Sequence, residues 1–144
     1  VELPEGEFNA AFNPEAVVKV TDVLLASHEN TAQIIDARPA TRFNAEVDEP
    51  RSGLRRGHIP GALNVPWTEL VREGELKTTD ELDAIFFGRG VSYDKPIIVS
   101  CGSGVTAAVV LLALATLDVT NVKLYDGAWS EWGARADLPV EPVK

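Results

Sequence analysis

The chain contains the stretch Ile97-Ile98-Val99-Ser100-Cys101-Gly102-Ser103-Gly104-Val105-Thr106-Ala107-Ala108. Its first four residues form a short apolar run that is typical of a buried parallel strand. The glycine-rich turn that follows leads into an apolar segment, Thr106 to Leu117, which we expect to form a helix packed on a sheet. Ligands of α/β proteins bind beyond the carboxyl ends of such strands, and Cys101 stands at this position.

Short apolar segments on both sides of this stretch predict further strands and helices. We expect strands at 16–20, 33–36, 62–65 and 122–125, and helical segments at 23–26 (with Thr21 and Asp22 as the cap), 67–71, 80–87 (with Thr79 as the cap) and 128–133. Residues 38–58 form a long polar loop of the kind that is usually functional or mobile. The alternation of strands and helices predicts an α/β fold with a mainly parallel central sheet and helices on both faces.

Length and charge restrict the class of protein. The 144 residues suit one domain, which we place at 15–144, after a lead-in or linker at 1–14. The net charge of −9 argues against a nucleic-acid or anionic-membrane partner. The longest apolar stretch is too short to span a bilayer. The sequence has no Met and begins without a signal peptide, so we expect it to be a processed product or a piece of a longer protein.

The single cysteine excludes several kinds of site. One Cys cannot form a disulfide within the chain, and Gly104 rules out a C-x-x-C redox pair. Phosphatases of the C-x5-R type need an arginine where this chain has Ala107. One Cys and two His at poor spacing do not predict a metal site. Two alternatives remain: Cys101 is a small buried apolar residue, or it is a reactive thiolate stabilised by turn N–H groups and the helix dipole.

Three further stretches resemble the rhodanese family of sulfurtransferases. They are Ile34-Ile35-Asp36-Ala37-Arg38 with Arg42-Phe43, Gly57-His58-Ile59-Pro60-Gly61-Ala62, and Tyr125-Asp126-Gly127-Ala128-Trp129-Ser130-Glu131-Trp132. Together with the cysteine turn, the resemblance extends from about residue 16 to the end of the chain. The turn itself resembles that of bacterial members that act on 3-mercaptopyruvate. Thiosulfate-specific members usually carry basic residues where this chain has Gly102 and Ser103.

The resemblance implies a rhodanese-like, catalytic C-terminal domain in which Cys101 takes sulfur from 3-mercaptopyruvate, forms a persulfide and releases pyruvate. A thiol acceptor such as thioredoxin or glutathione, or cyanide, then removes the sulfur, and no cofactor or metal is needed. The implied persulfide-stabilising N–H groups belong to Gly102, Ser103, Gly104, Val105 and Thr106.

The resemblance also assigns roles to the polar residues around the cysteine. Arg42 and Arg51 correspond to the two arginines that bind the substrate. Ser103 corresponds to the serine of a Ser-His-Asp relay, whose other members come from an N-terminal rhodanese domain that is absent from this chain. It is otherwise a turn residue. We expect His58 to be structural and the enzyme to be cytoplasmic.

We expect structural or solvent-exposed roles for the remaining candidates, which are Asp36, Arg38, Arg55, Arg56, His28, Trp67, Trp129 and Trp132. Two other functions stay open. One is sulfur transfer from thiosulfate, a dianion that prefers a more basic loop than this chain offers. The other is a non-catalytic rhodanese module that binds a partner, although an intact cysteine loop counts against it.

Overall fold

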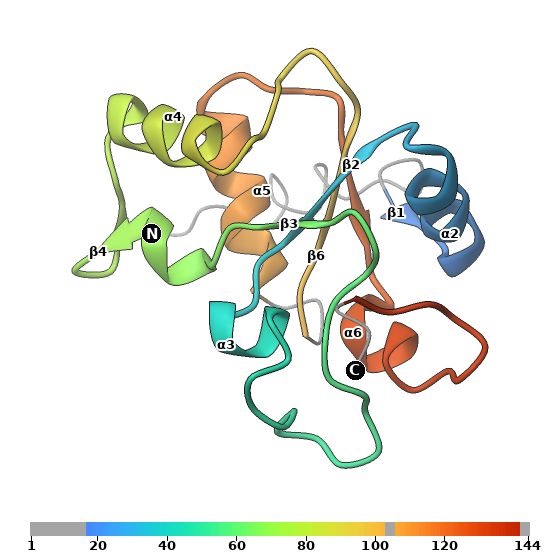
Figure 1. The fold of residues 1–144 in the computed structure, drawn as a ribbon. Helices are drawn as coiled ribbons and strands as arrows, with labels where there is room; N and C mark the ends of the chain where they lie inside the picture. The colour runs from blue at the N-terminus through green and yellow to red at the C-terminus, as the bar shows by residue number, and fades with distance from the viewer. Residues whose placement is uncertain (1–16, 103–105, 142–144) are drawn as a thin grey trace.

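A five-stranded parallel sheet forms the centre of the protein in the computed structural model, which describes residues 17–102 and 106–141 (Figure 1). Its strands are β1 (Val17–Val18), β2 (Gln33–Asp36), β3 (Leu63–Asn64), β6 (Ile97–Ser100) and β7 (Val122–Tyr125). They follow the order β1-β7-β6-β2-β3, and every neighbouring pair is parallel. The predicted α/β class is therefore confirmed, and the strand before Cys101 lies in the middle of the sheet.

Helices cover both faces of this sheet, as predicted (Figure 1). They are α2 (Val20–Glu29), α3 (Ala40–Phe43), the 3-10 helix η2 (Trp67–Leu70), α4 (Thr79–Gly88), α5 (Ala107–Thr116) and α6 (Ala128–Trp132). Helices α4 and α5 contribute to one apolar cluster, and α2 and α6 contribute to another. No helix in the described ranges is long and apolar enough to cross a membrane.

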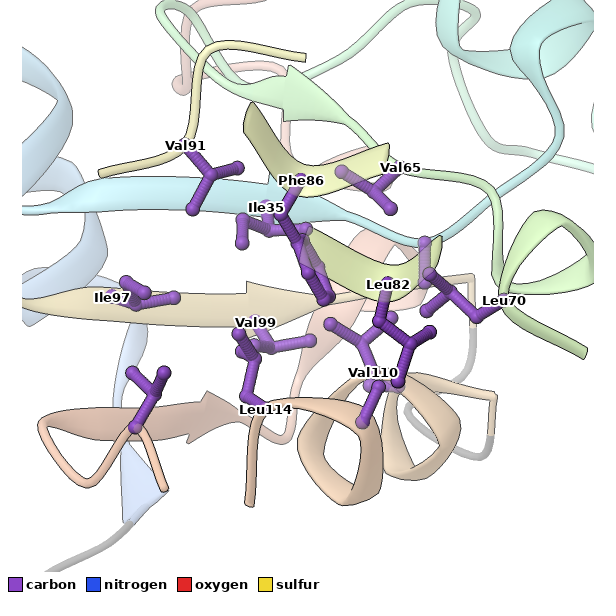
Figure 2. Packing of buried hydrophobic residues seen from close by; sticks show 14 of the residues in the cluster. Ile35, Val65, Leu70, Leu82, Phe86, Val91, Ile97, Val99, Val110 and Leu114 are labelled. Atoms are coloured by element: carbon purple, nitrogen blue, oxygen red, sulfur yellow. The ribbon is translucent and has the colours of Figure 1, made fainter. Parts of the chain in front are cut away.

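The alternation of side chains along β6 explains the two clusters. Ile97 and Val99 join the α4 and α5 cluster, whereas Ile98 belongs to the α2 and α6 cluster. Figure 2 shows Ile97 and Val99 packed with Phe86 of α4 and Leu114 of α5. All four residues of β6 are buried, and burial of one such apolar side chain contributes about 1.5–3 kcal/mol to stability. The cysteine turn therefore begins at a strand that is held firmly in the core.

Several element boundaries differ from the predicted ones. Helix α2 begins at Val20 with Lys19 as its N-cap, and Asp22 accepts a hydrogen bond from the Lys19 N–H at 2.9 Å. Asp22 therefore supports the helix from inside its first turn, and the predicted cap at 21–22 is wrong by two residues. Helix α4 is capped by Thr78, whose Oγ1 accepts a hydrogen bond from the Glu81 N–H at 3.2 Å.

Three short elements were not predicted. Helix α3 lies inside the segment expected to be a loop, and a hairpin of β4 (Val71–Arg72) and β5 (Glu75–Leu76) follows η2. Each has too few residues to show a helical or alternating apolar pattern. Helix α3 is the more important one for the site, because it carries Arg42.

Candidate active site

Cys101 lies at the junction between β6 and α5. Its side chain is buried, and the N–H of Ala107, the first residue of α5, donates a hydrogen bond to Sγ at 3.3 Å. A backbone donor and the positive end of a helix dipole both favour negative charge on this sulfur. Of the other predicted loop residues, Ser103, Gly104 and Val105 lie outside the described residues.

The first turn of α6 holds the beginning of the cysteine loop. The N–H of Trp129 donates to the Cys101 carbonyl at 2.8 Å, and the N–H of Ser130 donates to the Gly102 carbonyl at 2.9 Å. Because a trans peptide is planar, a carbonyl that points toward α6 directs the N–H of the next residue away from α6. The Gly102 N–H is therefore directed away from α6.

A small cavity borders this loop and brings most of the predicted substrate-binding residues together. It has a volume of about 230 Å³ and is lined by Arg42, Glu49, Pro50, Arg51, Leu54, Gly102, Thr106 and Ser130. Both predicted arginines and two of the predicted loop residues are therefore neighbours. Cys101 is not part of this lining, because it lies behind the surface of the loop with only 1% of its surface exposed.

Arg42 projects from α3 over the cysteine loop. A β-carbon on Gly102 would stand only 2.6 Å from Nη2 of Arg42, so no side chain fits at position 102 while the arginine keeps this position. The Arg42 side chain is 22% exposed. The guanidinium therefore combines a fixed position with access to a ligand in the cavity.

A buried ionic network fixes the base of the site. Arg38 is only 1% exposed, and it donates hydrogen bonds to Asp36 at 2.7 Å, to Glu49 at 3.0 Å and to the Gly57 carbonyl at 2.7 Å. Its guanidinium also lies 4.5 Å from the ring centre of Trp129. Asp36 accepts a hydrogen bond from the Arg38 N–H at 3.0 Å, as expected for a residue that orders the loop backbone.

Glu49 is the residue that sequence reasoning missed. Its carboxylate receives Arg42 on Oε1, with 3.2 Å to Nε and 2.7 Å to Nη2, and Arg38 on Oε2 at 3.0 Å. A buried guanidinium needs a counter-charge. The predicted loop holds several arginines and the three acids Glu46, Asp48 and Glu49, so its composition indicates that a counter-charge is present but does not single out Glu49.

His58 takes a structural position, as expected. Its ring stacks on Phe43 with 3.7 Å between the ring centres, and Nδ1 lies 2.7 Å from the Phe43 carbonyl oxygen. Its backbone forms a bridge with Glu141. Arg55 is structural too, because it donates to backbone carbonyls of the segment after α6, whereas Arg56 pairs with the exposed Asp48.

The remaining predicted residues are also structural or exposed. Trp129 and Trp132 are buried in the cluster with α2, and Trp67 packs on the cluster with α5. His28 is exposed near the end of α2.

Comparisons with known proteins found one family and several relatives. The rhodanese-like domain family matches residues 19–135. The chain is 98% identical over its whole length to 51% of a 3-mercaptopyruvate sulfurtransferase of Escherichia coli. It is also 40% identical, over 95% of its length, to 36% of a mitochondrial thiosulfate/3-mercaptopyruvate sulfurtransferase of Arabidopsis thaliana.

A solved structure extends the likeness to the fold. It is a crystal structure of a 3-mercaptopyruvate sulfotransferase from Escherichia coli, 95% identical, with a TM-score of 0.72 over 91% of this chain and 48% of that one. The chain spans about half the length of the curated relatives it matches. The family match covers four of the five strands of the central sheet, the cysteine turn and the arginine-bearing segment together, and the chain therefore belongs to the rhodanese family.

Proposed function

We propose that this chain is the sulfur-accepting, catalytic domain of a 3-mercaptopyruvate sulfurtransferase. The observation that carries the proposal is the position of Cys101, whose Sγ receives the Ala107 N–H at 3.3 Å beside a cavity lined by Arg42 and Arg51. A nucleophilic sulfur and two guanidinium groups are what a substrate with a thiol, a ketone and a carboxylate requires. The names of the E. coli relatives support the same substrate.

Sulfur transfer proceeds in two balanced steps. The Cys101 thiolate attacks the sulfur of 3-mercaptopyruvate, and the carbon–sulfur bond breaks with its electron pair staying on carbon. The resulting enolate takes up a proton and leaves as pyruvate, while Cys101 carries a persulfide. The thiolate of an acceptor such as thioredoxin or glutathione, or cyanide, then attacks the outer sulfur and restores the Cys101 thiolate.

The described residues divide this work between them. Arg42 and Arg51 hold the carboxylate and the ketone, and their N–H groups donate to the enolate oxygen as it forms. The N–H groups of Gly102 and Ala107 stabilise the anionic sulfur. Helix α6 keeps the loop in place through Trp129 and Ser130.

Proton transfer to the enolate involves a second part of the protein. We assign Ser103 to a Ser-His-Asp relay whose His and Asp lie in an N-terminal rhodanese domain, with residues 1–14 as the connection to 15–144. The roughly twofold greater length of the E. coli relatives supports this arrangement. We place the enzyme in the cytoplasm, where thioredoxin and glutathione are the abundant thiols.

Thiosulfate is the second candidate substrate, because the Arabidopsis relative carries both substrates in its name. It is a dianion without a planar carboxylate. The arginine pair beside Gly102 offers geometry suited to a carboxylate rather than additional positive charge next to the cysteine. We therefore expect turnover of 3-mercaptopyruvate to exceed that of thiosulfate.

Release of pyruvate tests the proposal. The chain, alone and combined with the N-terminal half of the E. coli relative, is incubated with 3-mercaptopyruvate and dithiothreitol, and in parallel with thiosulfate and cyanide. We expect pyruvate at a rate that exceeds thiocyanate formation, and neither product from Cys101→Ser. Faster thiocyanate formation contradicts the substrate assignment. Absence of both products, with both halves present and folded, contradicts sulfur transfer and favours a binding module.

A further inference from the structure

Glu49 lines the cavity beside Arg42, but its side chain is 0% exposed, whereas that of Arg42 is 22% exposed. We propose that Glu49 is a positioning residue: it holds the Arg42 guanidinium so that the edge formed by Nη1 and Nη2 faces the carboxylate of the substrate. The inference rests on the proposed function, because it takes a carboxylate as the group that Arg42 recognises. It concerns which donors Arg42 presents and how they are held there.

Two edges of a guanidinium can each form a bidentate contact with a carboxylate. One consists of Nε and Nη2, and the other consists of Nη1 and Nη2. Glu49 Oε1 occupies the first edge, at 3.2 Å from Nε and 2.7 Å from Nη2. Within the described ranges, 17–102 and 106–141, Nη1 of Arg42 makes no hydrogen bond. The second edge therefore remains to supply two parallel N–H donors to a ligand.

Glu49 is itself held from behind. Its side chain is 0% exposed, and its Oε2 accepts a hydrogen bond from Arg38 Nη1 at 3.0 Å. Arg38 is fixed in turn by Asp36, by the Gly57 carbonyl and by the face of the Trp129 ring. The charges alternate along Asp36, Arg38, Glu49 and Arg42. The last two line the cavity, and of these two only the Arg42 side chain is exposed.

The alternating charges affect which substrate Arg42 can recognise. Two carboxylates balance the two guanidinium groups, so Arg42 contributes little net positive charge to the cavity. It recognises its ligand through the direction of two N–H bonds, which matches a planar carboxylate better than a tetrahedral anion. Glu49 thus favours a carboxylate-bearing substrate over an anion of equal or greater charge.

Replacement of Glu49 by Gln removes this orientation while keeping the side-chain shape. The amide has one acceptor oxygen and one NH₂ group, and both of its neighbours are guanidinium donors. One donor must therefore face another donor. Arg42 is the more exposed of the two partners, at 22% against 1% for Arg38, so Arg42 is the one that moves.

Alkylation of Cys101 tests this role without sulfur transfer. Iodoacetate carries a carboxylate, iodoacetamide is neutral, and both leave a covalent adduct on the same sulfur. The ratio of their rate constants measures how well the cavity directs a carboxylate toward Cys101. It is measured in the wild type, in Glu49→Gln, in Arg42→Gln and in the double variant. Glu69→Gln is the matched control, because Glu69 pairs with Arg89 and does not line this cavity.

We expect Arg42→Gln to lower the ratio about tenfold, the equivalent of one hydrogen bond to a charged group. Glu49→Gln should lower it by a similar factor, and the double variant should fall no further, because Glu49 acts through Arg42. Glu69→Gln should keep the wild-type ratio. Glu49→Asp keeps the negative charge but shortens the side chain by one methylene group, so we expect an intermediate ratio. This second variant tests the proposal even if Glu49→Gln fails to fold.

Three results would overturn the proposal. The first is a wild-type ratio in folded Glu49→Gln or Glu49→Asp, which would leave Glu49 with a role in stability alone. The second is a double variant whose ratio is the product of the two single effects. The third is a wild-type ratio in Arg42→Gln, which would mean that Arg42 does not face the carboxylate. None of these results depends on pyruvate release, so they are distinct from a failure of the proposed function.

Discussion

The guanidinium of Arg42 and the backbone of Gly102 occupy adjoining space, and a β-carbon on Gly102 would stand 2.6 Å from Nη2 of Arg42. Arg42 cannot simply retreat, because Glu49 holds its Nε and Nη2. A residue larger than glycine at position 102 must therefore disturb the arginine. The position of the proposed substrate-binding group is coupled in this way to the residue that follows the nucleophile.

Substitution of Gly102 by Ala should therefore weaken substrate binding more than it weakens the fold. We expect KM for 3-mercaptopyruvate to rise about tenfold, the equivalent of one displaced hydrogen bond to a charged group. The free energy of unfolding should change by less than about 1 kcal/mol, because the atom that must move is the end of a side chain. Steady-state kinetics and urea denaturation measure the two effects.

Gly88→Ala is the matched control for this substitution. Gly88 lies at the end of α4, and a β-carbon added there would have no other atom within 4 Å. We expect this variant to keep the wild-type KM. A Gly102→Ala enzyme with unchanged KM would show that Arg42 does not bind the substrate from its present position.

The central strands could be predicted from sequence because each is a short run of apolar residues. Strands β2, β6 and β7 occupy the predicted residues 33–36, 97–100 and 122–125. Helix ends were less predictable, because a cap depends on a few hydrogen bonds. Aspartate is a residue type that favours the N-cap, yet Asp22 lies in the first turn of α2, where it accepts a hydrogen bond from the Lys19 N–H.

The residues of the candidate site, too, could be predicted only in part from the sequence. Cys101, Arg42 and Arg51 could be identified from their places in recognisable stretches, and the structure brings both arginines to one cavity beside the cysteine loop. Glu49 could not be found in this way, because its role arises only when α3 folds back and places Arg42 beside Arg38. Helix α6 binds the loop carbonyls through backbone hydrogen bonds, and no pattern of side chains in the sequence predicts such bonds.

The buried pair of Asp36 and Arg38 should be essential for stability. Their side chains are 5% and 1% exposed, and substitution of Asp36 by Asn leaves the Arg38 charge poorly compensated. We expect a loss of about 3–5 kcal/mol in the free energy of unfolding. Asp48→Asn breaks the exposed pair with Arg56 and should change stability by no more than about 1 kcal/mol. Equal losses in the two variants, measured by urea denaturation, would contradict this difference.

Glu81 should make the stability of the protein depend on acidic pH. The hydrogen bond from Arg72, followed by the one from the Thr78 N–H, lowers the pKa of Glu81 from 4.5 to about 2. Because the folded-state pKa is depressed, the stabilisation is present above the unfolded-state value and disappears as the pH falls toward the folded-state value.

Glu81→Gln should therefore be less stable than the wild type at neutral pH, and the difference should shrink as the pH falls from 4.5 toward about 2. Thermal unfolding of both proteins across this range measures the difference. A gap in midpoint that is the same in acid as at neutral pH would show that the Glu81 charge is not responsible.

The two tyrosines should resist ionisation. Burial, and then hydrogen bonds to Asp83 and Glu131, raise the pKa values of Tyr93 and Tyr125 above the ordinary value of 10.0. The unfolded chain therefore loses these protons first, and stability falls as the pH rises above 10.0. We expect tyrosinate absorbance to appear together with the loss of circular dichroism. Tyrosinate absorbance that appears near pH 10.0 in a protein that is still folded would contradict the expected rise in the two pKa values.

Cys101, with the Ala107 N–H at its sulfur, should carry the transferred sulfur as a persulfide. This persulfide can be observed by intact-mass and peptide mass spectrometry after incubation with 3-mercaptopyruvate, with the N-terminal half of the E. coli relative supplied and no acceptor thiol present. We expect a gain of one sulfur atom on the peptide that contains Cys101, its removal by dithiothreitol, and no gain in Cys101→Ser. A folded protein whose Cys101 peptide never gains that mass would show that sulfur is not transferred through Cys101.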